Sequence, residues 1–140
     1  MRLRTMARKF ALQILYQTEI TKEPIDKVLD KFWNMTNFES RTRKFADGLV
    51  YGVMKHLPMI DQAIEKFAEN WELHRMPVVD LCILRIATYE LFYLSDIPPA
   101  VSINEAIELA KEFSTEKSAK FINGVLDRLK ECAEAREQEG

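Results

Sequence analysis

The sequence has few of the residues that form turns or disulfide bonds. It holds four glycines and five prolines in 140 residues, too few for the many turns of an all-β protein. Its two cysteines, Cys82 and Cys132, cannot form the disulfide scaffold of a small secreted domain. No apolar signal region follows the basic residues at the N-terminus. These shortages favour a helical protein in a reduced, cytoplasmic setting.

The usual signs of catalysis and metal binding are also missing from the sequence. Its glycines form no phosphate-binding loop. The two histidines, His56 and His74, are 18 residues apart, with no cysteine or carboxylate at metal-ligand spacing beside them. No set of Ser, His and Asp or of Cys and His suggests a nucleophile. We therefore predict no catalytic residue, no metal and no cofactor, and a protein that is not an enzyme.

The net charge of −2 excludes the strong overall basicity of many nucleic-acid-binding domains, so such binding requires a local patch. The first 18 residues carry Arg2, Arg4, Arg8 and Lys9 and no acid. Cations beside a nucleic-acid backbone release counterions, and Tyr16 on the same segment has a ring on which a base can stack. Charge alone leaves two interpretations open, which are RNA binding and simple solubilisation of a helix end.

The most apolar stretch is Asp80 to Leu94, in which eleven of fifteen residues are apolar or aromatic. After Asp80, only Arg85, Thr88 and Glu90 interrupt it, so it has no continuous polar face. It is shorter than the roughly 20 residues of a membrane span and longer than a typical strand of four to eight residues. We predict a helix surrounded by other helices, and no membrane segment.

Apolar residues at three- and four-residue spacing predict six further helices. We expect these helices at about residues 3–20, 25–32, 39–55, 58–71, 103–113 and 121–129. Ser102 and Glu105 have the spacing of a capping box, which marks a helix start. From Glu131 the chain is acidic and is expected to fray. The fold class is therefore all-α, a single domain over residues 1–140 with about seven helices around a buried central helix.

Three glycines within predicted helices suggest close packing, because each glycine costs a helix about 1 kcal/mol relative to alanine. Gly48 and Gly52 are four residues apart, which favours tight contact with another helix or, less simply, a dimer contact. Gly124 suits a close helix crossing.

Several segments together resemble a known protein family. They are ARKFALQILYQ (7–17), ILRIATYEL (83–91), DIP (96–98), SINEAIELAKEF (102–113) and KFINGVLD (120–127). This combination is similar to the NusB family of bacterial transcription antitermination factors, and the similarity covers nearly the whole chain.

The resemblance implies an all-helical, non-enzymatic RNA-binding protein. Members of this family bind the single-stranded boxA element of nascent RNA together with NusE, a small-subunit ribosomal protein. They join RNA polymerase in complexes that suppress termination, notably on ribosomal RNA operons. The same functions and partners are expected here.

The resemblance also assigns roles to individual residues. The positions that match RNA-contacting residues of the family are Arg4, Arg8, Tyr16, Lys120 and Phe121. We add Lys9 and Lys117 for their charge alone, and Phe121 has the alternative of being a core residue. Asp80 matches an acidic position on the surface that receives the partner.

Thr5 and Met6 stand where the family can have arginine, so we expect tight RNA binding to need the NusE-like partner. Two alternatives stay open. One is the RNA-recognition domain of a ribosomal RNA methyltransferase, which we expect only if this chain is a fragment of a longer protein. The other is a protein-interaction bundle or homodimer without RNA contact.

Overall fold

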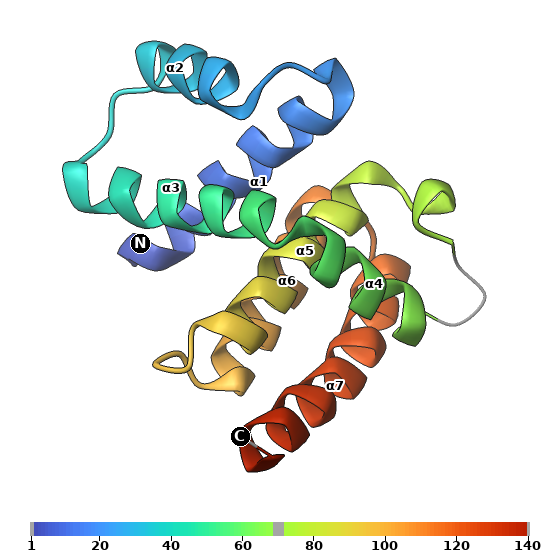
Figure 1. Ribbon diagram of the computed structural model, residues 1–140. Helices are drawn as coiled ribbons and strands as arrows, with labels where there is room; N and C mark the ends of the chain where they lie inside the picture. Colours follow the sequence, from blue (N-terminus) through green and yellow to red (C-terminus); the bar gives the residue numbers. More distant parts are fainter. Residues whose placement is uncertain (1, 69–71, 140) are drawn as a thin grey trace.

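The computed structural model describes residues 2–68 and 72–139, with side chains up to residue 136. This part of the chain forms seven α-helices and one 3-10 turn, and it contains no strand. The elements are α1 (Leu3–Thr21), α2 (Ile25–Met35), α3 (Ser40–Lys55), α4 (Leu57–Phe67), η1 (Leu73–Arg75), α5 (Val78–Tyr93), α6 (Pro99–Phe113) and α7 (Glu116–Glu139). The predicted all-α architecture of about seven helices is confirmed (Figure 1).

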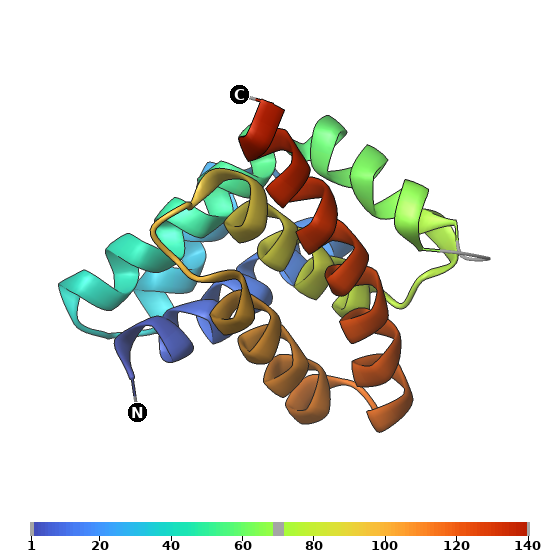
Figure 2. The same cartoon turned by 90° about the horizontal axis from the view of Figure 1, so that it is seen from below.

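Helix α5 is the centre of the molecule, as its lack of a polar face predicts. Every residue from Asp80 to Thr88 is buried, together with Glu90 and Leu91. Helices α1, α3, α4, α6 and α7 all contact it. Figures 1 and 2 show α5 in the middle of the bundle from two directions.

Helices α1, α2 and α3 form one end of the molecule around a cluster of aromatic rings. Phe10 of α1 lies edge-to-face with Phe32, Trp33 and Phe38, with ring centroids 5.0–5.6 Å apart. Such pairs stabilise a fold beyond their buried area, by about 0.5–1.5 kcal/mol each. The cluster fixes the exposed side of α1 relative to α2 and α3.

The predicted capping box is wrong. Helix α6 begins at Pro99, because proline is pre-shaped for a first helical turn, and Ser102 therefore lies inside the helix. The Ser102 hydroxyl donates to Glu90 Oε1 at 2.7 Å, and Glu105 faces Arg8 and Thr5 of α1. Both side chains serve tertiary contacts between helices.

Of the three glycines, only Gly52 confirms the prediction of close packing. A Cβ atom at Gly52 would overlap the ring of Tyr89 on α5, whereas one at Gly48 or at Gly124 would meet no atom within 4 Å. The expectation of close packing is therefore wrong for Gly48 and Gly124. A dimer contact through α3 stays a prediction.

The ends of two helices differ from the sequence prediction. Helix α4 ends at Phe67, and Trp71, expected to continue it, lies outside the described residues. Helix α7 continues through the acidic segment to Glu139. Fraying of residues 131–140 and the single-domain assignment stay predictions. The described part of the chain holds no helix with the length and apolar character that a bilayer crossing requires.

Candidate nucleic-acid interface

Helix α1 is exposed at its two ends, whereas its middle part is covered by neighbouring helices. The buried residues Ala7, Phe10, Ala11, Ile14 and Leu15 recur at three- and four-residue spacing. The exposed residues are Arg2, which precedes the helix, and Arg4, Gln13, Tyr16, Gln17 and Ile20 within it. Helix α1 therefore presents basic residues at its N-terminal end and an aromatic ring near its C-terminal end.

Tyr16 lies on the wall of an open, mostly apolar groove of about 690 Å³. Four segments form this groove: α1, α2, the first turn of α5 and the end of α6. Its lining includes Leu12, Tyr16, Val28, Phe32, Val79 and Phe113, with Gln13, Gln17 and Lys31 among the polar residues. Tyr16 is 38% exposed, so part of this residue remains open to a ligand.

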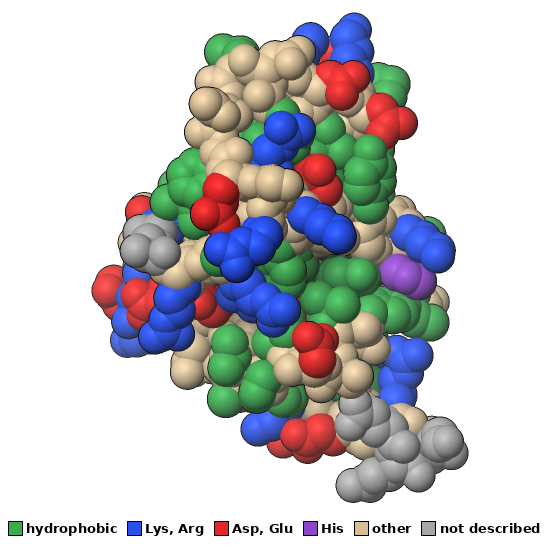
Figure 3. Space-filling view, turned by 90° about the vertical axis from the view of Figure 1, so that its left-hand side faces the viewer, with side chains coloured by type: hydrophobic (Ala, Val, Ile, Leu, Met, Phe, Trp, Pro, Cys, Tyr) green, Lys and Arg blue, Asp and Glu red, His purple; other side chains and the backbone are tan. Residues whose placement is uncertain are grey.

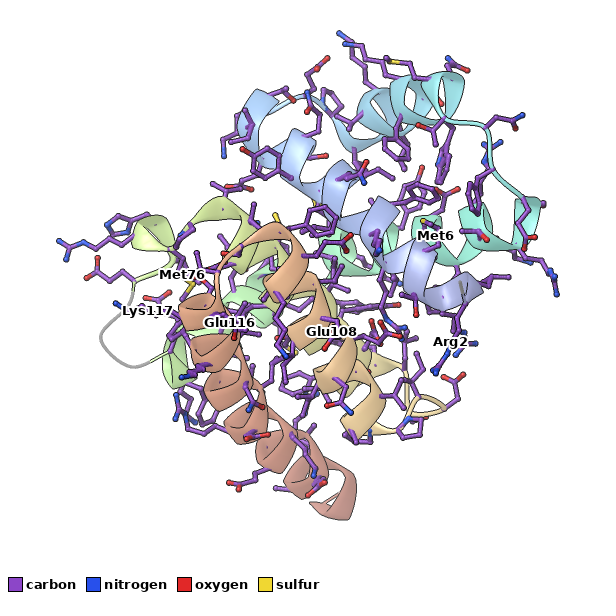
Figure 4. The ribbon with its side chains drawn as sticks, turned by 180° about the vertical axis from the view of Figure 1, so that it is seen from behind. Arg2, Met6, Met76, Glu108, Glu116 and Lys117 are labelled. Carbon is purple, nitrogen blue, oxygen red and sulfur yellow. The ribbon has the colours of Figure 1, made fainter. Side chains whose placement is uncertain are left out.

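The first turns of α7 follow closely after the end of α6, which contributes Phe113 to the same groove. Lys117 and Lys120 are exposed there, and Phe121 is half-buried against the main core. In Figure 4, Lys117 and Arg2 lie on opposite sides of the molecule, with Glu108 of α6 between them. The predicted basic residues are therefore divided between two regions.

Arg8 does not occupy the surface position that the sequence analysis assigns to it. Its residue is 2% exposed, and its Nε and Nη2 atoms each donate to a carboxylate oxygen of Glu90 at 2.8 Å. Glu105 lies 3.5 Å from its Nη1 atom. Burial opposes the charged form, but the hydrogen bonds and the charge of Glu90 outweigh it and raise the pKa of Arg8. Arg8 holds α1 against α5 and α6, and its guanidinium is enclosed.

Asp80 is also buried, at 3% exposure, and does not lie on the surface, so its role toward a partner stays a prediction. Its two carboxylate oxygens accept hydrogen bonds of 2.7 Å from the hydroxyls of Ser114 and Ser118. These contacts tie the start of α5 to the joint between α6 and α7. The residue of α5 that lines the groove beside Tyr16 is Val79, the neighbour of Asp80.

The remaining predicted residues are partly engaged. Lys9 Nζ lies 3.0 Å from Glu112, and its side chain is 18% exposed. The Arg4 side chain is 51% exposed, with its guanidinium 4.6 Å from the centre of the Phe45 ring and 3.9 Å from Asp96. Arg4 and Tyr16 are thus open to a ligand, whereas Lys9 is mostly covered.

The sequence analysis missed basic residues on α3. Arg41 and Lys44 are exposed and border a groove that Arg4 shares. The run Arg41–Lys44 contains three cations and no acid, which is the signal that could have identified it. Among the described residues, no three His, Cys, Asp or Glu side chains are grouped to hold a metal ion.

Comparison with known proteins identifies relatives along nearly the whole chain. The model of the NusB family matches residues 5–131. The transcription antitermination protein NusB of Trichlorobacter lovleyi is 47% identical over 138 residues, which are 99% of this chain and 97% of that protein. The protein of the same name from Thermodesulfovibrio yellowstonii is 40% identical, with 90% of each chain covered.

Solved structures agree with these relatives. NusB of T. maritima superposes with a TM-score of 0.85 at 39% identity, covering 91% of this chain and 90% of that one. A chain from a crystal structure of the antitermination factors NusB and NusE in complex with dsRNA gives a TM-score of 0.87 at 28% identity, covering 94% and 98%. Sequence and fold therefore agree, and the chain belongs to the NusB family.

Proposed function

We propose that this protein is a non-enzymatic transcription antitermination factor that binds a boxA-type single-stranded RNA together with a NusE-like ribosomal protein. In this role it joins the RNA polymerase complex in the cytoplasm and supports transcription of ribosomal RNA operons. The observation that carries the proposal is the exposed Tyr16 on an apolar groove that reaches the end of α6, with Lys117 and Lys120 on the following helix. The solved relative described with NusE and dsRNA supports it.

The chemistry of these residues suits a single strand. A base stacks on an aromatic face in a manner that tolerates different sequences, and Tyr16 offers such a face. The ammonium groups of Lys117 and Lys120 neutralise phosphates, and Arg4 extends the basic surface at the other end of α1. Phe121 adds apolar area beside Lys120. Arg8 acts indirectly by holding α1 in place.

The partner has a separate role in this proposal. The groove beside Tyr16 exposes apolar side chains of several helices, including Met35 at 88% exposure and Phe113 at 39%. A protein partner that covers part of this groove would bury apolar surface and complete an RNA site. We therefore expect tight RNA binding to need the partner.

The first test measures binding of a boxA-like RNA and of a scrambled RNA, each with and without the NusE-like protein, at several salt concentrations. We expect preference for boxA-like RNA, stronger binding with the partner, and weaker binding as salt rises. Tyr16→Ala and Lys120→Gln should each reduce affinity about fivefold or more, as expected for loss of a stacked base or a phosphate contact.

The control for Lys120→Gln is Lys55→Gln, which removes the same charge from the exposed C-terminal end of α3. It should bind as the wild type does. Equal affinity for both RNAs in every mixture, by a protein that remains folded, would exclude the proposed function.

A further inference from the structure

A second groove lies on a different side of α1 from Tyr16. It has a volume of about 440 Å³ and is formed by the N-terminal part of α1, by α3, and by Tyr89 and Leu94. Its lining consists of Leu3, Arg4, Arg41, Lys44, Phe45, Gly48, Leu49, Tyr89 and Leu94. Figure 3 views the side of the molecule that carries the N-terminus and shows Lys and Arg side chains gathered around apolar surface.

The charged residues that line this groove are all cations. Arg4, Arg41 and Lys44 come from two helices, and no carboxylate is among the lining residues. Two acids form long, exposed ion pairs with these cations: Asp96 lies 3.9 Å from Arg4, and Glu39 lies 3.6 Å from Arg41, whose side chain is 83% exposed. Because exposed pairs of this kind contribute little energy, the three cations stay available to an anionic ligand.

The floor of the groove is aromatic. Phe45 and Tyr89 both line it, and the Arg4 guanidinium lies over the Phe45 ring. Gly48 also lines the groove, and a Cβ atom there would meet nothing within 4 Å. At Gly52, one helical turn further along α3, the ring of Tyr89 instead occupies the space that a side chain would take. The missing side chain at Gly48 therefore keeps the floor accessible.

We propose that this groove binds a second segment of single-stranded RNA, with phosphates on Arg41 and Lys44 and a base against the floor formed by Phe45, Gly48 and Tyr89. Cations around aromatic surface are the combination by which single strands are held without reading of their sequence. An acidic peptide would match the charge but would leave the aromatic floor unexplained. The proposal rests on the proposed function and extends it to RNA that flanks the boxA-like element.

The two RNA regions lie within reach of one strand. Arg4 and Tyr16 are twelve residues apart on α1, which corresponds to about 18 Å along the helix axis. Helix α1 itself carries no acid before Glu19, but Glu105 and Glu112 of α6 contact Thr5 and Lys9 between the two regions. Arg4 and Tyr16 also differ by about a third of a turn around the helix, so a strand that joins the two regions passes around α1 as well as along it.

The test compares two RNAs on the full chain with its NusE-like partner. One is the boxA-like RNA, and the other is the same RNA extended at each end by about ten uridines, a length typical of single-strand sites. Lys44→Gln removes a groove cation, and Lys55→Gln is the matched control on the same helix. Gly48→Leu fills the groove and should leave the helical circular dichroism unchanged.

We expect Lys44→Gln and Gly48→Leu to weaken binding of the extended RNA about threefold to tenfold, while binding of the unextended RNA stays as in the wild type. The plot of log affinity against log salt has a negative slope. Lys44→Gln should make this slope less steep by about 0.7, the value for one single-strand phosphate contact. The Lys55→Gln variant should show neither change.

Other outcomes separate the groove from the proposed function. If wild-type protein binds the unextended RNA but both groove variants match Lys55→Gln on the extended RNA, the groove assignment is overturned and the proposed function stands. If the wild type shows no preference for boxA-like RNA but both groove variants still bind the extended RNA more weakly, the groove assignment is kept and the proposed function is excluded. Displacement of the extension by polyglutamate as effectively as by oligouridine would overturn the assignment to RNA.

Discussion

Arg8 is the residue at which three helices meet. It projects from α1 to Glu90 of α5 and to Glu105 of α6, and Ser102 of α6 donates to the same Glu90 carboxylate. A buried charge of this kind is costly unless its partner is present. The sequence indicates that Arg8 is basic, but its main partner is 82 residues away, so burial could not be predicted from local spacing.

Removing the Glu90 charge should destabilise the fold strongly. Glu90→Gln leaves Arg8 buried without its main counter-charge, and we expect a loss of about 3 kcal/mol in the free energy of unfolding. Urea denaturation followed by circular dichroism measures this loss. The matched change Glu112→Gln disrupts the more exposed pair with Lys9 and should cost less than about 1 kcal/mol. Similar losses for both variants would show that Arg8 does not depend on Glu90.

Gly48 and Gly52 offer a second test at the residue scale. Gly48→Ala should raise the free energy of unfolding by up to about 1 kcal/mol, because it improves helix propensity and meets no neighbour. Gly52→Ala should lower that energy by roughly 1–3 kcal/mol, because its Cβ would overlap the Tyr89 ring. Thermal or urea denaturation of the two variants provides the comparison. A stabilising Gly52→Ala would mean that Tyr89 moves aside without cost.

At the scale of elements, the 3.6-residue pattern was sufficient to predict most helices and the central place of α5. It failed where the decisive contact is distant in sequence. Asp80 is polar and near a helix start, which favours exposure, yet Ser114 and Ser118 enclose it from 34 and 38 residues away. The prediction for Ser102 failed in a similar way. Its spacing to Glu105 matches a capping box, but the helix begins earlier, at Pro99.

A network of charges joins α1, α4 and α5. Arg85 donates from Nε and Nη2 to both oxygens of Asp61, at 2.8 and 2.9 Å, and from Nη1 to Glu19 at 3.1 Å. Burial of Glu19 disfavours its charged form, but hydrogen bonds from Lys22 and Arg85 outweigh this and lower its pKa below the usual 4.5. Glu19 therefore contributes stability as a carboxylate.

The lowered pKa of Glu19 has a defined effect on acid stability. The contribution of this group is complete above its unfolded-state pKa of about 4.5 and is lost as pH falls through the lower folded-state value. Glu19→Gln should be less stable than wild type at pH 7, and the difference should shrink below about pH 4.5. Denaturant unfolding over pH 3–7 tests this, and a difference that stays constant across the range would contradict it.

At the scale of the whole molecule, one core connects all seven helices. The main apolar cluster includes Leu12 of α1, Leu29 of α2, Leu49 of α3, Ile60 of α4 and Leu126 of α7, with all of these at most 5% exposed. Residues of α5 and α6 belong to the same cluster. A core shared in this way favours unfolding in one cooperative step.

Cys82 provides a reporter of that step. It is fully buried on α5, and burial raises its pKa to about 12, so the reactive thiolate is scarce in the folded protein. In a Cys132→Ser background, a thiol reagent should label Cys82 with the same urea midpoint as the loss of helical circular dichroism. Labelling at clearly lower urea would reveal local opening around α5 and contradict a single step.

The central position of α5 has a consequence for synthesis of the chain. Helices α1 to α4 leave the ribosome before the helix against which α1, α3 and α4 pack. About 25 residues separate the end of α4 from the end of α5, which corresponds to roughly 1–5 s of elongation at about 5–20 residues per second. During this interval the apolar faces of the early helices are exposed on the nascent chain. A chaperone that binds nascent chains, or a pause in translation, can therefore alter the yield of folded protein.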